Sequence, residues 1–247
     1  MTIKTKTKLI LPVNAGVVVL TGLVTVVSAQ SGPVSVDALT DQLKARAEQA
    51  VNAGQVANGK HDGEKVFTGD AAKELGELHK KASDAKSQSL ARPASERAAA
   101  VAKIRAFSGN QGLNPEYAST ARSSYNSKVN AEFYRVGADY FEVDTRTNEI
   151  VQFGPAPMEN GETAKAYNTE AKFSPEQLEA KAREFIAKNA SNADLSKLEA
   201  STGEKSGTNF FFRWTDESRD IDGTKPFVQV GFTTGGDLLS YTNSLGL

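Results

Sequence analysis

The chain contains no cysteine and only two histidines among its 247 residues. Without cysteine it cannot form a disulfide bond or carry a lipid on an N-terminal cysteine. The two histidines, His61 in a loop of glycine and aspartate and His79 on a polar helical stretch, are too little material for a His-based catalytic triad or a multi-histidine metal site. Stability must therefore come from ordinary hydrophobic cores.

Long runs of basic residues are also missing. The formal net charge is −1, and it becomes −4 if residues 1–29, which hold three lysines and no acidic residue, are removed. A protein that binds nucleic acid without sequence preference needs clustered Lys and Arg to neutralise phosphates. We therefore expect no nucleic-acid partner.

The first 29 residues have the order of an export signal. Lys4, Lys6 and Lys8 precede an apolar run, and Val27-Ser28-Ala29 provides the small residues of a cleavage site. The apolar run is long enough to cross a bilayer, so a retained anchor is the alternative. In both cases the lysines orient the rest of the chain away from the cytoplasm. We predict a secreted, periplasmic or cell-surface protein, cleaved after Ala29 or anchored by residues 1–29, its only membrane contact.

Residues 30–92 are predicted to form a polar helical segment or stalk. Apolar residues recur at helical spacing from Leu39 to Val51, with Asp37 as the expected N-cap and Gly54 as the end of the pattern. A second helical pattern begins at Asp70. Leucines are few and alanines many in both, so these helices need a packing partner or serve as a spacer.

The remaining residues contain a duplication. Residues 144–153 reappear 88 positions later as residues 232–241, each around a tight turn, and Phe133-Tyr134-Arg135 matches Phe211-Phe212-Arg213 at an offset of 78. We predict repeat 1 over residues 93–157 and repeat 2 over residues 158–247.

Each repeat begins with a helical pattern and continues with segments rich in aromatic and β-branched residues. Ser95 is the expected N-cap of the first helix, and Ser174-Pro175-Glu176-Gln177 has the form of a capping box before the second. The predicted fold class is α+β, with two tandem repeats of one helix packed on a three- to four-stranded antiparallel sheet. In the closing hairpins, Gly235-Gly236 can adopt positive φ freely, whereas Thr147-Asn148 depends on the tolerance of asparagine for that region.

The closing hairpin of each copy resembles the PepSY-like modules of secreted and membrane-anchored bacterial proteins. Residues 140–153 (YFEVDTRTNEIVQF) and 227–241 (FVQVGFTTGGDLLSY) carry the resemblance, which covers residues 93–247. The copies depart from the motif in complementary ways: the first keeps Asp144 but has Asn148 for glycine, and the second keeps Gly236 but has Phe232 for aspartate. The resemblance implies a non-catalytic module outside the cytoplasm, which in some relatives is part of a protease propeptide with an inhibitory or chaperone role.

Two constellations suggest chemistry but are incomplete. Residues 83–86 fit the S-x-x-K and residues 124–126 the S-x-N of penicillin-recognising enzymes, yet the third element, Lys-Thr-Gly, is absent. The loop of residues 216–223 offers four carboxylates but lacks the distal bidentate glutamate of a calcium loop, since Gln229 occupies that position. We therefore predict no enzyme, no cofactor and no metal.

Period-two alternation divides the strands at residues 131–136 and 209–214 between two faces. Glu132, Tyr134 and Val136, and in the second copy Phe210, Phe212 and Trp214, are expected to lie under the helix. The opposite face carries Phe133, Arg135, Phe211 and Arg213, because an arginine is too costly to bury unpaired. These four residues are our candidate protein-binding residues, since aromatic and arginine side chains dominate binding hot spots; the alternative is that they only pack the repeats together or extend over the sheet.

Two functions are favoured over a third, a hydrolase, for which the motifs are incomplete. The first is a binding module for an envelope or secreted protein such as a peptidase, and the second is a spacer of the cell envelope without a specific ligand.

Overall fold

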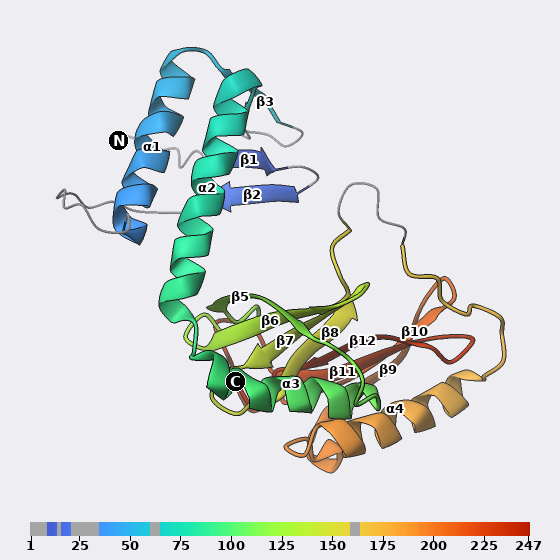
Figure 1. Ribbon diagram of the computed structural model, residues 1–247. Helices are drawn as coiled ribbons and strands as arrows, with labels where there is room; N and C mark the ends of the chain where they lie inside the picture. Colours follow the sequence, from blue (N-terminus) through green and yellow to red (C-terminus); the bar gives the residue numbers. More distant parts are fainter. Residues whose placement is uncertain (1–8, 14–15, 21–34, 60–64, 159–163) are drawn as a thin grey trace. The chain divides into compact units, whose positions relative to one another are not determined.

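The computed structural model describes residues 9–13, 16–20, 35–59, 65–158 and 164–247 (Figure 1). They form two compact units, Met1–Ser89 and Leu90–Leu247. The expected cleavage site at Ala29 and the loop around His61 lie outside the described residues.

The first unit combines two helices with short strands. In chain order its elements are β1 (Leu9–Val13), β2 (Gly16–Leu20), α1 (Val36–Asn52), β3 (Val56–Asn58), β4 (Lys65–Phe67) and α2 (Gly69–Leu90). The strands form a sheet of order β2-β1-β4-β3, in which β1 and β4 are parallel. The core is small and is made of Leu43, Ala47, Ala50, Phe67, Ala71 and Leu75. The two helices confirm the helical patterns, whereas β3 and β4 are too short to be recognised by periodicity.

The cap of α1 differs from the expectation. Ser35, not Asp37, is the N-cap, and its side chain accepts a hydrogen bond from the backbone N–H of Ala38. Asp37 lies in the first turn, where a carboxylate interacts favourably with the helix dipole. The helix therefore begins one residue before the predicted cap.

The second unit contains both repeats. Repeat 1 consists of α3 (Ala94–Ser108), β5 (Glu116–Arg122), β6 (Asn130–Val136), β7 (Asp139–Asp144) and β8 (Ile150–Pro155). Repeat 2 consists of α4 (Pro175–Asn189), the short 3₁₀ helix Leu195–Lys197, β9 (Glu199–Ser206), β10 (Asn209–Thr215), β11 (Phe227–Thr233) and β12 (Leu238–Asn243). The α+β class is confirmed, and each repeat has one helix and four strands, the upper number of the three to four predicted.

The eight strands form one antiparallel sheet of order β5-β6-β7-β8-β12-β11-β10-β9. Across the sheet, the strands of the second repeat follow in the reverse order of those of the first. The two halves of the sheet meet at β8 and β12, and this order relates them by an approximate twofold axis. The central pairing is short and joins Phe153 to Tyr241 and Gln152 to Thr242. Helices α3 and α4 cover the same side of this sheet (Figure 1).

The duplication is visible in the pairing of the closing hairpins. Ile150 begins β8 and Leu238 begins β12, and both hairpins have a bulge one residue later, at Val151 and Leu239. A shared bulge is specific evidence, because bulges are conserved features of related sheets. The two copies are equivalent units.

The turns before these strands differ by one residue. Ile150 pairs with Val143, and Leu238 pairs with Phe232, so Phe232 corresponds to Val143 and not to Asp144 as the constant offset predicted. The turn of the first copy has one more residue than the turn of the second. Residues after the turn therefore correspond at an offset of 88, whereas residues of the strand before it do not. Phe232 is therefore a core residue of a strand and does not replace an aspartate.

Positive φ occurs at equivalent positions in the two turns, at 58° for Asn148 and 89° for Gly236. Gly235 has no positive φ, contrary to the expectation for a two-residue turn. Its role is close packing, because a Cβ atom at Gly235 would lie 2.4 Å from the carbonyl oxygen of Asn168.

The two repeat helices begin differently. The capping box at Ser174 is confirmed, with Gln177 donating its backbone N–H to the serine hydroxyl and accepting from the serine backbone. Ser95 is not the N-cap of α3; Pro93 holds that position and makes no side-chain cap bond. Pro93 has a non-helical ψ of 145°, so the helix begins at Ala94 and Ser95 lies inside its first turn.

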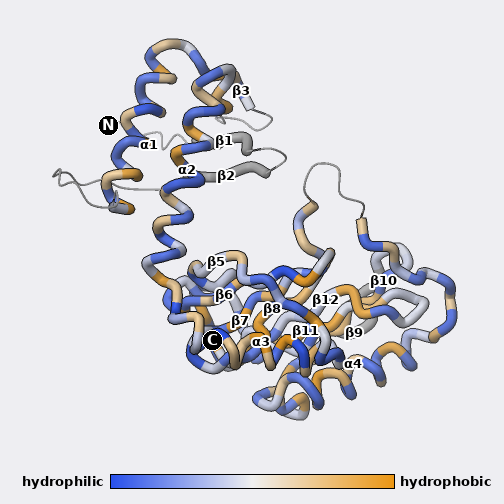
Figure 2. The backbone as a smooth tube through the Cα atoms, viewed as in Figure 1, coloured by the Kyte–Doolittle hydropathy of each residue, from blue (hydrophilic) through white to orange (hydrophobic). Residues whose placement is uncertain are grey.

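The core of the second unit lies between the two helices and the sheet. Because only one side of α4 faces this core, hydrophobic and hydrophilic residues alternate along the helix (Figure 2). Tyr134, Phe210, Phe212 and Trp214 are all buried in this core, as predicted. Phe107 at the end of α3 contacts Phe185 of α4 with ring centroids 5.2 Å apart, so one core joins the two repeats.

Glu132 is the exception on the helix-covered face. It is fully buried, and its carboxylate accepts from Arg92 at 3.0 and 2.6 Å and from the Tyr134 hydroxyl at 2.8 Å. Arg92 also donates to the Thr145 carbonyl at 2.8 Å and to the Asn148 side chain at 3.0 Å. The first repeat thus places a buried ion pair where the second has the apolar pair Phe210 and Phe212.

Candidate functional site

One side of the eight-stranded sheet carries neither α3 nor α4, and we call it the open face. The side chains that alternate away from the core define it: Phe133, Arg135, Tyr140, Glu142, Gln152, Phe211, Arg213, Phe227, Gln229 and Thr242. Because successive side chains of a strand point to opposite sides, these residues share one surface. All four candidate binding residues belong to it.

In repeat 1, Phe133 and Arg135 follow each other along the outer side of β6. Phe133 stacks on Tyr140 of β7, with ring centroids 5.6 Å apart, and is only 7% exposed. Arg135 is half-buried and donates from Nε to the Gly137 carbonyl at 3.0 Å. Phe133 therefore faces outward from the core but is covered by its neighbours on the open face.

In repeat 2, Phe211 and Arg213 lie along the outer side of β10. The Phe211 ring rests on Gly231 of the adjacent strand, where a Cβ atom would approach it to 2.8 Å. The Arg213 guanidinium lies 4.0 Å from the centre of the Phe227 ring, and its Nε donates to Gln229 at 2.7 Å. Arg213 is exposed above an aromatic platform, a geometry that supports a cation–π contact.

The structure does not bring the two pairs together. Four strands lie between β6 and β10, and at about 4.8 Å per strand spacing the pairs are on the order of 24 Å apart. The open face thus carries two separate patches, one from each repeat. Every contact described above for Arg135 and Arg213 stays within its own repeat.

Glu142 lies next to Phe133 across the strand pair and is fully buried on the open face. Its Oε1 accepts from the Ser123 hydroxyl at 2.6 Å and from the Ser124 backbone at 3.1 Å, while Oε2 has no hydrogen-bond partner among the described residues. Burial, and secondly the charge of Glu142, raises the pKa of Tyr140 to about 12. This part of the face is preformed by the loop that follows β5.

That loop also places Tyr125 on the open face. The Tyr125 ring contacts Phe227 edge-on at 5.9 Å, and its hydroxyl lies 3.4 Å from the Thr242 hydroxyl. Arg213 and Phe227 of repeat 2 and Tyr125 of repeat 1 together form an aromatic and cationic patch. Sequence reasoning missed Tyr125, since a loop residue carries no periodic signal, but Tyr140 and Phe227 follow from continuing the strand alternation.

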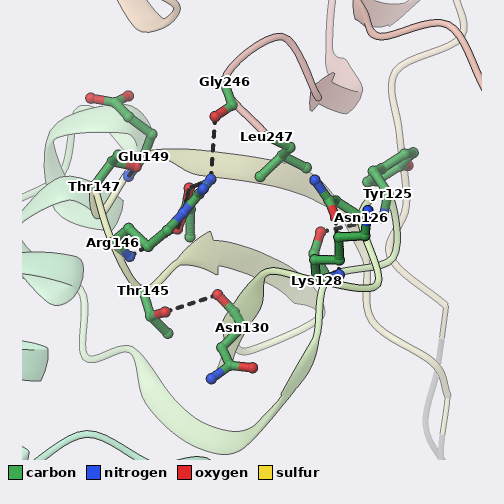
Figure 3. Close-up of polar contacts among 12 residues, drawn as sticks. Tyr125, Asn126, Lys128, Asn130, Thr145, Arg146, Thr147, Glu149, Gly246 and Leu247 are labelled. Atoms are coloured by element: carbon green, nitrogen blue, oxygen red, sulfur yellow. Dashed lines mark hydrogen bonds and ion pairs between the residues drawn. The ribbon is translucent and has the colours of Figure 1, made fainter. Parts of the chain in front are cut away.

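Asp144, the aspartate of the resemblance motif, is a structural residue. It is 2% exposed, and its carboxylate accepts from the backbone N–H of Arg146 at 2.8 Å and from its Nη2 at 2.7 Å. The hydrogen bond to Asp144 raises the pKa of Arg146. The same guanidinium donates to the Gly246 carbonyl at 3.2 Å and so fastens the turn to the C-terminal residues (Figure 3).

The incomplete catalytic motif is divided between the two units. Ser83 and Lys86 lie on α2 in the first unit, and Ser124 and Asn126 lie in the loop after β5 in the second. The backbone N–H of Ser124 donates to Glu142.

Three carboxylates of residues 216–223 accept hydrogen bonds, two within local turns and one from a distant loop. Asp216 accepts from Ser218, Asp220 accepts from the Gly223 backbone, and Asp222 accepts from the hydroxyl and backbone of Ser127. These hydrogen bonds lower the pKa of Asp216 and Asp222. Within the described part of the chain, no group of three or more His, Cys, Asp or Glu side chains is arranged to hold a metal ion.

None of the described helices is long and apolar enough to cross a membrane.

No protein-family model and no curated protein matches this chain. Among solved structures, the chain is similar to the Bacillus megaterium YpeB C-terminal domain, with a TM-score of 0.39 and 12% sequence identity over 59% of this chain. The chain spans 62% of that structure's length.

Proposed function

We propose that this chain is a non-catalytic binding module that works outside the cytoplasm and docks an envelope or secreted protein, such as a peptidase, on its open face. The proposal rests mainly on the two pairs of phenylalanine and arginine, which the duplication places at corresponding positions on the side of the sheet that carries neither α3 nor α4. Arginine and aromatic residues are enriched at binding hot spots. The resemblance of the closing hairpins to PepSY-like modules supports the non-catalytic and extracytoplasmic parts of the proposal.

The test is capture of partners from the envelope and secreted fractions of the source cells. Arg135 and Arg213 are both changed to Glu, which removes the arginine contacts and inverts the charge of both patches. The matched control changes Lys81 and Lys188 to Glu; both are exposed, neither lies on the open face, and the change in formal charge is the same. The proposal requires the arginine variant to fold but lose a partner that the wild type and the control retain.

Three results would decide against it. Unchanged capture by the arginine variant would place any binding surface elsewhere. Loss of folding, judged by the fluorescence of the single tryptophan, would support the alternative in which the arginines only extend over and stabilise the sheet. A wild-type chain that captures nothing would favour a spacer.

The location is tested separately by mass spectrometry of the natural protein. Cleavage after Ala29 predicts a mature chain that begins at Gln30, and a retained anchor predicts an intact N-terminus in the membrane fraction. An intact chain in the cytosol would contradict both versions.

A further inference from the structure

A groove of about 790 Å³ opens on the helix-covered side of the sheet, opposite the open face. It lies where the end of α3, the β6–β7 turn and the start of β12 meet the side of α4. Its apolar lining includes Phe107, Phe141, Phe153 and Phe185, one each from α3, β7, β8 and α4. Phe107 contacts the other three rings at centroid distances of 5.2 to 5.8 Å. Both repeats therefore build this aromatic floor.

The rim of the groove is polar and has a net negative charge. Lys165 donates from Nζ to both carboxylate oxygens of Asp139, at 2.7 and 2.8 Å, so these two charges neutralise each other. Asp237 also lines the groove; it accepts from the Asn168 backbone at 2.7 Å and forms no ion pair with any residue that the structure describes. One carboxylate thus remains without a cation beside the phenylalanine floor.

Tyr167 lines the same rim and has an unused polar group. Its hydroxyl is shielded from solvent and has no hydrogen-bond partner among the described residues. Burial raises the pKa of Tyr167, Lys165 opposes this shift, and the charges of Asp139 and Asp237 add to it. The hydroxyl is therefore close enough to the rim charges to be influenced by them, and an unpaired buried hydroxyl is unfavourable unless a further partner is supplied.

We propose that this groove binds a small molecule that combines an apolar body with a protonated amine. The apolar body packs on the phenylalanine floor, and the ammonium group lies beside Asp237 and donates to the Tyr167 hydroxyl. The volume falls within the range of about 300–1,000 Å³ for small-molecule sites, which pair an apolar lining with a few polar groups. A ligand carboxylate in the same position would face Asp237 without compensation. This site is distinct from the open face and does not depend on protein docking there.

The test uses two matched probes, 4-phenylbutylamine and 4-phenylbutyrate, titrated into the ¹⁵N-labelled full chain. The amine should shift the backbone amide signals of Ser108, Gly137 and Leu238, which line the groove, and should bind at least about tenfold more tightly than the carboxylate. Equal affinities would show an unselective apolar surface. No binding of the amine, or shifts confined to other residues, would overturn the proposal.

Two variants test whether Asp237 and Tyr167 contact the amine of the ligand. Asp237→Asn keeps an acceptor for the Asn168 backbone but removes the charge. It should weaken amine binding about tenfold and should not weaken binding of the carboxylate, which no longer faces a like charge. Tyr167→Phe should weaken amine binding about threefold to tenfold. The control Asp41→Asn, on α1 in the first unit, should leave both affinities unchanged. Well-dispersed spectra establish that each variant is folded, and a folded Asp237→Asn protein with wild-type amine affinity would contradict the assignment.

Discussion

The buried ion pair between Arg92 and Glu132 gives the sharpest prediction about stability. Arg92→Met keeps most of the apolar stem and removes the guanidinium. It therefore leaves the fully buried Glu132 carboxylate with the Tyr134 hydroxyl as its remaining described partner. It also removes the donors to Thr145 and Asn148, which hold the β7–β8 turn.

The expected loss follows from burial. Removing one partner of a buried ion pair costs about 3–5 kcal/mol, because the remaining charge is uncompensated. The Arg92 side chain is 16% exposed, so water can partly replace it. We therefore expect a loss of about 3 kcal/mol in the free energy of unfolding.

The matched variant copies the second repeat. Arg92→Met combined with Glu132→Leu and Tyr134→Phe makes this region apolar, as Phe210 and Phe212 do in repeat 2. Replacing a whole buried ion pair by apolar residues is often neutral or stabilising, so the triple variant should lie within about 1 kcal/mol of the wild type or above it.

The assay is denaturant unfolding followed by Trp214 fluorescence. This residue is the only tryptophan, and it is 1% exposed in the shared core, so its signal reports the second unit in the intact chain. A single variant as stable as the wild type would refute the reasoning. A triple variant as unstable as the single one would show that the ion pair is needed for its geometry and not only for charge compensation.

Three further predictions concern the turns, the pH response and the caps. Gly235→Ala should cost about 1–3 kcal/mol, because the new Cβ would clash with the backbone of Asn168; the same fluorescence assay measures it, and a neutral result would show that residue 168 moves freely. The raised pKa of Tyr140, about 12 against 10.0 when unfolded, means that the unfolded chain loses this proton first. The stability that the protonated Tyr140 contributes is complete below pH 10 and is lost as the pH rises towards 12. The denaturation midpoint of the wild type should therefore fall between pH 9 and 11, and Tyr140→Phe should make this fall smaller. An equal fall in the variant would contradict the assignment. Ser174→Ala should destabilise by about 1 kcal/mol while Ser95→Ala, which removes no cap bond, should not; equal effects on the denaturation midpoint would contradict the assignment of caps.

The sequence predicts much of the second unit because its signals are local. The capping box at Ser174 and the alternation through Phe210, Phe212 and Trp214 each depend on neighbouring residues, and the structure confirms them. The duplication also predicts that Ile150 and Leu238 begin equivalent strands. A constant offset could not detect the extra residue in the first turn, since only the pairing of Val143 and Phe232 reveals it.

Other features depend on contacts between distant residues. Glu132 reads as a polar interruption of a buried face until Arg92, 40 residues earlier, is placed beside it. The packing role of Gly235 likewise depends on Asn168, 67 positions before it in the chain and brought close only by the fold. The sequence predicts that Phe133, Arg135, Phe211 and Arg213 lie on the outer side of their strands. That they form two separate patches follows only from the strand order, which places four strands between β6 and β10.

The central claim, that the open face is the docking surface, is tested most directly by site-specific photocrosslinking in the source cells. A photoreactive amino acid at Gln152, in the middle of the open face, is compared with the same residue at Glu184, exposed on α4. Our account predicts a crosslinked partner from position 152 and none from position 184. Crosslinking of that partner from position 184 alone would contradict it.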